Sequence, residues 1–274
     1  MANEEYEMSV IKWRQEMDNN LRRENGWLAL AGLFWLRRGT NLIGSTPACD
    51  ILLPSRAPAR LGTFEFDGDN VRLNIEADLR VEVNGVSAKS ALLDADLEDV
   101  PSFISFNDMR MVVVRRSKGV GIRVWDNTRA ARRLFPKREW YPVKKEFRIP
   151  ATFTPYETPK IVKMPDILGA ILDEPMQGYV TFEFDGQTYE LIVAEEPDRR
   201  LFIQFMDLTN GNPTYPSGRY HYTDPHKNGK VFIDFNKAYS PPCAFTEYAT
   251  CTFPPRENHL NIPIEAGEIY PDHL

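Results

Sequence analysis

Short segments in which apolar and polar residues alternate, each closed by a glycine-containing turn, constrain the fold of this chain most strongly. Pairs of such segments fall within residues 64–73, 81–86, 109–125 and 179–193. Three of the turns carry Asn-Gly or Asp-Gly, the dipeptides that two-residue hairpins favour. Because regularly spaced short strands build sandwiches and barrels, we predict an all-β fold beyond residue 40.

The N-terminal residues follow a helical period instead. Apolar side chains recur at spacings of three and four over residues 4–24, which predicts an amphipathic helix. The residues on this face are Val10, Trp13, Met17 and Leu21. Gly26 ends the pattern, since glycine commonly lies just beyond a helix. The apolar stretch 27–36 is too hydrophobic for a surface, and we expect it to pack beneath the first β-domain.

The chain length and the change of period predict a division into three parts. A chain of 274 residues is long enough for about two domains. We expect residues 1–36 to form the N-terminal helix and apolar segment, and residues 37–138 a β-sandwich. Residues 139–274 then form a second antiparallel β-sandwich or barrel. The junction falls in the basic, aromatic and turn-rich stretch 127–150.

Composition excludes several classes of protein. The net charge is −6, which argues against nucleic acid or an anionic membrane as a partner. No apolar run reaches the ~20 residues of a membrane span, and the acidic N-terminus lacks the plan of a signal peptide. The three cysteines form no CxxC and do not make a disulfide framework. We therefore expect a soluble, cytoplasmic protein with a small-molecule ligand, and the sequence leaves its oligomeric state open.

The stretch 214–268 carries the motifs that resemble a known family. Read in order along the whole chain, they are Trp27–Leu36, Trp140–Val143, Thr214-Tyr215, Gly218-Arg219, Asp234–Tyr239, Pro241–Phe245, Ala249–Cys251, Pro254–Asn258 and Ala266–Glu268. With these motifs the chain resembles the family of unknown function numbered 1684. Ser240 stands where that family usually has Asn, and Thr252 where Pro commonly follows the second Cys. The resemblance implies no established activity.

Residues 40–126 resemble a forkhead-associated β-sandwich. The resemblance rests on Asn41–Ser45, Cys49–Pro54 and Val83–Gly85. Modules of that type bind phosphothreonine through an Arg after the first Gly and a Ser-Arg-His-like loop. Here the first position is Ser45, which cannot supply a phosphate fork, and the loop has Arg56 but no His. The resemblance therefore implies the sandwich without phosphopeptide binding.

Four polar residues between 207 and 236 form the main candidate site. Strand alternation puts Asp207 and Asp234 on faces shared with large apolar residues, so a buried carboxylate there needs a partner. Arg219 is the obvious candidate because arginine forks onto carboxylates. In the functional interpretation Arg219 binds an anionic ligand while Asp234 and Asn236 act as base or hydrogen-bond partners. In the structural interpretation the Arg–Asp pair only closes the domain, and the sequence favours this for Asp207.

Cysteine and tyrosine residues extend this candidate site. Cys243 is a candidate nucleophile, with Tyr215 and Tyr239 as walls of the pocket. A catalytic thiol needs a base, and the spacing of His259 does not establish one. Two buried thiols, or a disulfide between Cys243 and Cys251, fit the sequence better.

Metal binding and a basic surface complete the alternatives. The sequence His221-x-x-Asp224-x-His226 sits in a loop, and we expect neither a metal nor a cofactor. The basic run 109–138 contains Arg129 and Arg133, which we consider candidate ligand contacts at the predicted domain junction. Charge balance favours a simpler role, in which the run complements the acidic second half of the chain.

The sequence therefore predicts a protein that binds or processes a small anionic or polar metabolite in the C-terminal β-domain. No nucleophile elbow, Walker loop or dinucleotide-binding motif is present, so the usual serine hydrolase, NTPase and Rossmann classes lack support. Whether the protein is an enzyme stays open. The rival hypothesis is a non-enzymatic structural or interaction protein whose motifs only hold the fold.

Overall fold

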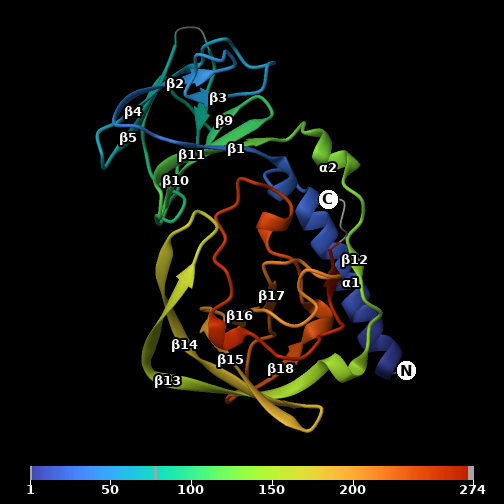
Figure 1. The fold of residues 1–274 in the computed structure, drawn as a ribbon. Helices are drawn as coiled ribbons and strands as arrows, with labels where there is room; N and C mark the ends of the chain where they lie inside the picture. The colour runs from blue at the N-terminus through green and yellow to red at the C-terminus, as the bar shows by residue number, and fades with distance from the viewer. Residues whose placement is uncertain (1, 77–78, 271–274) are drawn as a thin grey trace. The chain divides into compact units, whose positions relative to one another are not determined.

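The computed structural model describes residues 2–76 and 79–270, and Figure 1 traces the fold. The chain separates into two compact units. We call residues 20–135 the N-terminal sandwich, and residues 1–19 with 136–274 the C-terminal β-domain. This grouping cuts across the predicted segment 1–36, because helix α1 (Ala2–Arg22) gives most of its length to the C-terminal β-domain.

Two sheets form the N-terminal sandwich. The first has the strand order β1 (Leu30–Trp35), β11 (Gly119–Asp126), β10 (Met109–Arg116), β9 (Ile104–Phe106), β6 (Glu82–Val83) and β7 (Val86–Ser87). The second has the order β3 (Ile51–Leu52), β2 (Gly39–Gly44), β4 (Gly62–Phe66), β5 (Val71–Ile75) and β8 (Ser90–Leu93). Both sheets contribute to one buried cluster that includes Phe64, Leu73, Met111 and Ile122. Two short helices, η1 (Trp27–Ala29) and α2 (Ala130–Leu134), flank the sheets.

The hairpin turns explain why these strands pair in register. Asn84 and Gly85 have φ of 50° and 81°, and Asp185 and Gly186 have φ of 51° and 75°. Two successive positive φ values define the turn whose twist matches that of the flanking strands. The predicted hairpins therefore form where the Asn-Gly and Asp-Gly dipeptides lie.

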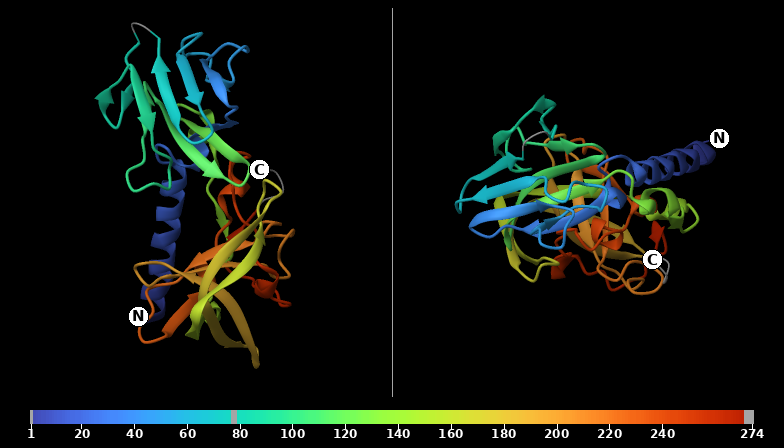
Figure 2. Two further views of the ribbon diagram at one scale, coloured as in Figure 1. Left: turned by 90° about the vertical axis from the view of Figure 1, so that its left-hand side faces the viewer. Right: turned by 90° about the horizontal axis from the view of Figure 1, so that it is seen from above.

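One antiparallel sheet forms the framework of the C-terminal β-domain (Figures 1 and 2). Its strand order is β17 (Arg219–Tyr222), β16 (Leu201–Phe205), β15 (Gln187–Glu195), β14 (Ile171–Phe184), β13 (Arg148–Pro165) and β18 (Lys230–Asp234). The short strands β12 (Glu139–Trp140) and β19 (Glu268–Ile269) pair separately. The long strands β13 and β14 form the hairpin that is prominent in Figure 2.

Most of the chain after β18 closes the core of this domain outside the sheets. It contains the short helices η3 (Phe235–Lys237), η4 (Pro242–Ala244) and η5 (Arg256–Asn258), while η2 (Lys145–Phe147) precedes β13. Phe235, Leu260 and Ile264 pack with Phe182 and Phe205 of the sheet in one cluster. Proline-rich segments favour such a closure because they cannot continue a hydrogen-bonded ladder.

Helix α1 is held to the C-terminal β-domain by aromatic and arginine contacts. The Trp13 ring meets Trp140 edge-on at 5.7 Å between centroids and lies 6.3 Å from Tyr239. The Arg14 guanidinium lies 4.8 Å from the Trp140 ring and donates to the Tyr141 carbonyl at 2.9 Å. The partners of α1 lie more than a hundred residues away in the chain. The hydrophobic periodicity of the sequence could therefore predict the helix but not the surface on which it packs.

The predicted all-β fold with an N-terminal helix is confirmed. No helix within the described residues is long and apolar enough to span a membrane.

Asn258, the last residue of the Pro254–Asn258 motif, joins two strands to the closing segment. Its side-chain amide donates to the carbonyls of Ile192 and Gln204 at 2.8 Å each and accepts from the Ile192 N–H at 2.7 Å. Because the side chain is buried, water cannot supply hydrogen bonds to it, and these protein groups satisfy the amide instead. This motif residue therefore holds β15 and β16 to η5.

We expect Asn258→Ala to lower the free energy of unfolding by about 3 kcal/mol, because it leaves buried backbone groups unpaired. Urea titration followed by circular dichroism measures this loss. Asn261→Ala is the matched control, since Asn261 is exposed. Equal unfolding midpoints for the two variants would contradict the assigned role.

Candidate functional site

Arg219 and Asp207 form a completely buried ion pair in the C-terminal β-domain. Neither side chain has measurable solvent exposure, and the guanidinium donates to the Asp207 carboxylate at 2.7 Å. Arg219 begins β17 and Asp207 follows β16, so the pairing of these strands brings the two charges together. Gly218 has a φ of 92°, and a Cβ there would meet the Phe205 carbonyl at 2.8 Å. The Gly218-Arg219 motif is therefore required by the backbone as well as by the charge.

The remaining bonds of this pair go to backbone groups and to the Thr209 hydroxyl. Arg219 also donates to the carbonyls of Ile264, at 2.9 Å, and Ala266. Asp207 accepts from the Ile264 N–H at 3.2 Å and from the Thr209 hydroxyl at 2.6 Å. A guanidinium with these partners and no exposed surface does not offer a fork to a ligand. The geometry thus favours the structural interpretation for both residues, and the partner of Arg219 is Asp207, not Asp234.

Asp234 and Asn236 form a second polar cluster with Tyr6 of α1. The Tyr6 hydroxyl donates to Asp234 at 2.8 Å and accepts from the Asn236 amide at 2.9 Å. The Asn236 amide also donates to Asp234 at 3.1 Å and to the Lys144 carbonyl at 2.8 Å. One Asp234 oxygen, Oδ2, is buried without a hydrogen-bond partner among the described residues. The cluster links helix α1, β18 and the chain before β13.

Charged neighbours tune this second cluster. Burial and the adjacent Asp234 carboxylate raise the pKa of Tyr6, so its hydroxyl stays a proton donor. Burial lowers the pKa of Arg14 to about 10, against the attraction of Asp234. The Arg148 guanidinium lies 5.5 Å from the Tyr6 ring and 3.8 Å from the Phe232 ring. Phe232 and Asp234 do share a face, as predicted, but Val231 and Ile233 are the β18 residues that enter the hydrophobic core.

His221 is buried beside this cluster. Its Nε2 accepts from the Asp234 backbone N–H at 3.3 Å. Burial, together with nearby Lys237, lowers the pKa of His221 to about 4. His226 instead pairs with Glu195 at 2.8 Å. Two histidines with separate partners do not form a metal site, and no group of three metal-ligating side chains occurs in the described part of the chain.

A third polar cluster, which the sequence did not indicate, surrounds Glu268. This buried carboxylate accepts from the Ser240 backbone N–H at 2.7 Å and pairs with Arg138 at 2.8 Å. Asp18 of α1 lies 3.8 Å from Arg138. Burial raises the pKa of Glu268, although Arg138 opposes the shift. The motif Ala266–Glu268 is the signal that could have located it, since a carboxylate at the end of an apolar motif needs a cation.

The two thiols of the 243–251 segment lie together. Neither Cys243 nor Cys251 forms a disulfide, and both are half-buried. The Cys251 thiol hydrogen-bonds to Cys243 and lowers the pKa of Cys243 to about 7 against the effect of burial, and Tyr215 adds a further bond. Burial raises the pKa of Tyr215, which keeps that hydroxyl protonated as a donor. Cys243 lies within η4. It has hydrogen-bond donors beside it and is partly exposed to solvent.

Aromatic rings frame the two thiols. Tyr215 packs edge-on against Tyr270 at 4.9 Å between centroids. Tyr220 lies near Cys251, and its hydroxyl donates to the Thr252 carbonyl at 2.8 Å. Tyr239 is half-buried and pairs with Tyr220 through backbone hydrogen bonds of 2.8 and 2.9 Å. Tyr215 is therefore the predicted wall residue that contacts Cys243, whereas Tyr239 contacts Trp13 and Tyr220.

The predicted residues thus separate into distinct places. Asp207 pairs with Arg219, Asp234 and Asn236 bond to Tyr6, and Cys243 lies with Tyr215. Arg129 and Arg133 belong to the N-terminal sandwich, where Arg129 donates to the Leu30 carbonyl and Arg133 lines a cavity. The pairing of strands in the sheet decides which of these residues become neighbours. The spacing of the residues along the sequence does not show this pairing.

Taken together, the fold and these clusters define an all-β protein whose C-terminal β-domain combines buried polar networks with a reachable thiol pair. The chain belongs to the family described as Protein of unknown function (DUF1684), whose model matches residues 133–269, half of the chain. A search of curated proteins found no match.

Several solved structures are similar to parts of the chain. An uncharacterized protein of Haloarcula marismortui, solved by NMR, is 30% identical with a TM-score of 0.43, and the match covers 51% of this chain and 79% of that one. The FHA domain of FhaA, solved in complex with an intracellular domain, is 19% identical with a TM-score of 0.25, covering 33% and 85%. A structure from work on phosphothreonine-dependent FHA domain interactions is 20% identical with a TM-score of 0.24, covering 33% and 79%.

We expect Arg219→Ala to lower the free energy of unfolding by about 3–5 kcal/mol, because it leaves the Asp207 charge buried without its cation. Urea unfolding at neutral pH measures the change. Arg256→Ala serves as the control, since Arg256 is exposed on η5. A variant as stable as this control would show that Arg219 is not a structural residue.

We expect the stability to fall as pH falls from 6.5 towards 4, because the unfolded chain then binds a proton that buried His221 does not. The full loss from this one group is about 3 kcal/mol. Urea titrations at pH 7.0 and 4.5 should show a smaller difference for His221→Gln than for the unmodified protein. His259→Gln, at an exposed position, should keep the original pH dependence.

Proposed function

We propose that the C-terminal β-domain binds and processes a small polar or anionic metabolite through its thiol pair, by thiol–disulfide exchange. The feature that carries the proposal is the position of half-buried Cys243 beside Cys251 and Tyr215, whose S–H and O–H groups favour its thiolate. A thiolate is the nucleophile in such chemistry, and donors around a thiol favour this form. Of the predicted catalytic residues, Asp234 and Asn236 would then have a structural role, and Cys243 would be the reactive residue.

The reaction balances with a small disulfide as the oxidant. The Cys243 thiolate attacks one sulfur of the disulfide, forms a mixed disulfide and expels the other half as a thiolate. Cys251 then loses its proton and attacks Cys243, which forms the internal disulfide and expels the second half. Two protein thiols are oxidised and one small disulfide is reduced to two thiols. The interaction with Cys243, followed by burial, raises the pKa of Cys251, so Cys243 is the attacking residue and Cys251 the resolving one.

The alternative is a non-enzymatic protein whose motifs hold the fold. The buried networks around Arg219, Asn258 and Glu268 favour it, because the Arg219 and Glu268 charges and the Asn258 amide each have partners within the protein. These networks account for three of the family motifs without a ligand. They do not account for a half-buried thiol with two hydrogen-bond donors, which is why we place the chemistry at Cys243.

We expect the alkylation rate of Cys243 by iodoacetamide to rise with pH around a midpoint near 7, rather than the ~8.5 of an ordinary thiol. Cys251→Ala and Tyr215→Phe should both raise this midpoint, since each removes a bond that stabilises the thiolate. Mass spectrometry of the peptides assigns each rate to its cysteine. Cys49 is the internal control, because it is half-buried but lies in the N-terminal sandwich.

Exchange itself is tested with oxidised glutathione as the probe. The unmodified protein should form the Cys243–Cys251 disulfide, and Cys251→Ser should accumulate the mixed disulfide at Cys243. Modification of Cys49 at the same rate as Cys243, or a Cys243 midpoint that ignores both substitutions, would reject thiol chemistry in favour of the structural alternative.

A further inference from the structure

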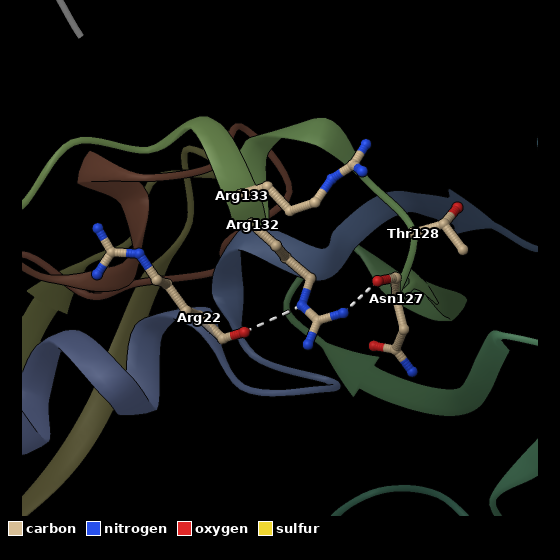
Figure 3. A pocket seen from close by; sticks show the side chains of 5 residues that line it. All are labelled: Arg22, Asn127, Thr128, Arg132 and Arg133. Atoms are coloured by element: carbon tan, nitrogen blue, oxygen red, sulfur yellow. Dashed lines mark hydrogen bonds between the residues drawn. The ribbon is translucent and has the colours of Figure 1, made fainter.

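A cavity of about 340 Å³ opens in the N-terminal sandwich (Figure 3). Its lining residues are Arg22, Asn127, Thr128, Arg132 and Arg133. They come from the end of α1, the segment after β11 and helix α2. The volume lies at the small end of the range typical of metabolite sites, roughly 300–1,000 Å³. The lining contains three arginines and no acidic residue.

Arg132 is held in place by backbone carbonyls. Arg132 donates through Nε to the Arg22 carbonyl at 3.0 Å and through a terminal nitrogen to the Asn127 carbonyl, as Figure 3 shows. Arg22 donates to the Phe135 carbonyl at 2.8 Å. Arg133 is exposed and makes no hydrogen bond or ion pair with any described residue. The positive charge of Arg132 and Arg133 is thus uncompensated within the described part of the chain.

Asp126, the acidic residue next to the lining residues in the sequence, is already bonded to other groups. Asp126 accepts a fork from Arg56 at 2.7 and 2.5 Å and further bonds from the Thr128 N–H and hydroxyl at 2.8 and 2.7 Å. Burial disfavours its charge, but the Arg56 fork and Thr128 hold the pKa of Asp126 at about 2. Its carboxylate is therefore charged, paired with Arg56, and not available to neutralise the cavity.

We propose that this cavity binds a small phosphate-bearing anion, either free phosphate or a phosphomonoester. Guanidinium groups recognise phosphate oxygens through paired N–H donors, and cations without an acidic partner supply the charge that such an anion needs. The Asn127 amide, which donates to Asn25 Oδ1 at 3.3 Å, keeps a second N–H that no described residue accepts. This site is independent of the thiol pair, since it lies wholly within the N-terminal sandwich.

Isothermal titration of the full chain with inorganic phosphate tests the proposal, with chloride at the same ionic strength as the reference. The unmodified protein should bind phosphate, and Arg133→Gln should weaken binding at least tenfold because it removes an uncompensated cation. Arg133→Lys should bind with intermediate affinity, since it keeps the charge but loses the fork. Arg80→Gln is the matched control, because the Arg80 side chain is 82% exposed and lies outside the cavity.

Glucose 6-phosphate in place of inorganic phosphate distinguishes the two sources of the anion. Tighter binding of the phosphomonoester identifies a metabolite site, and tighter binding of inorganic phosphate identifies a site for the free ion. The proposal is overturned if phosphate binds no better than chloride, or if Arg80→Gln weakens binding as much as Arg133→Gln. Thermal melts check folding, and Arg133→Gln should melt like the unmodified protein because its side chain makes no bond to lose.

Discussion

The C-terminal β-domain depends on one dry ion pair, Arg219 with Asp207. The pair joins β16 and β17 and, through backbone bonds, also fixes residues 264–266 of the returning chain. That segment leads directly to Glu268, whose carboxylate binds Arg138 and the chain before η4. A buried ion pair contributes little net stability but is costly to break, so it specifies one closure of the domain more than it strengthens it. The polar motifs after β16 are readily understood as consequences of this closure.

The two proposed ligand sites use opposite chemical strategies. Around Cys243, hydrogen-bond donors stabilise a negative charge on the protein itself. In the cavity beside Arg132 and Arg133, the protein holds positive charge, and no acidic side chain of the described residues lines it. Because each site lies within a single compact unit, either chemistry could be present without the other. The two proposed sites also differ from the structural networks in exposure, since Arg219 and Glu268 are shielded from solvent.

The sequence predicted local structure well and long-range partners poorly. Period-two alternation and Asn84-Gly85 determine a hairpin because the interactions are local. The partner of Arg219 was less accessible, since Asp207 and Asp234 both follow strands and only the strand order distinguishes them. The role of Tyr6 could not be predicted, because a tyrosine in an amphipathic helix gives no sign that it will bind a carboxylate 228 residues away. Pairing across the sheet therefore decides the candidate site.

The division of α1 between the two units has a consequence for how the chain is assembled. Residues 20–135 form an inserted module within a discontinuous domain made of residues 1–19 and 136–274. The two ends of the insertion are fastened together, because Arg22 binds the Phe135 carbonyl and the Asn25 N–H binds Asn127 at 2.8 Å. During synthesis the module is complete before its host, since Trp140 and Tyr239, against which Trp13 packs, both follow the module in the chain. Residues 1–19 therefore gain their partners in the C-terminal β-domain only after residues 20–135 have been synthesised.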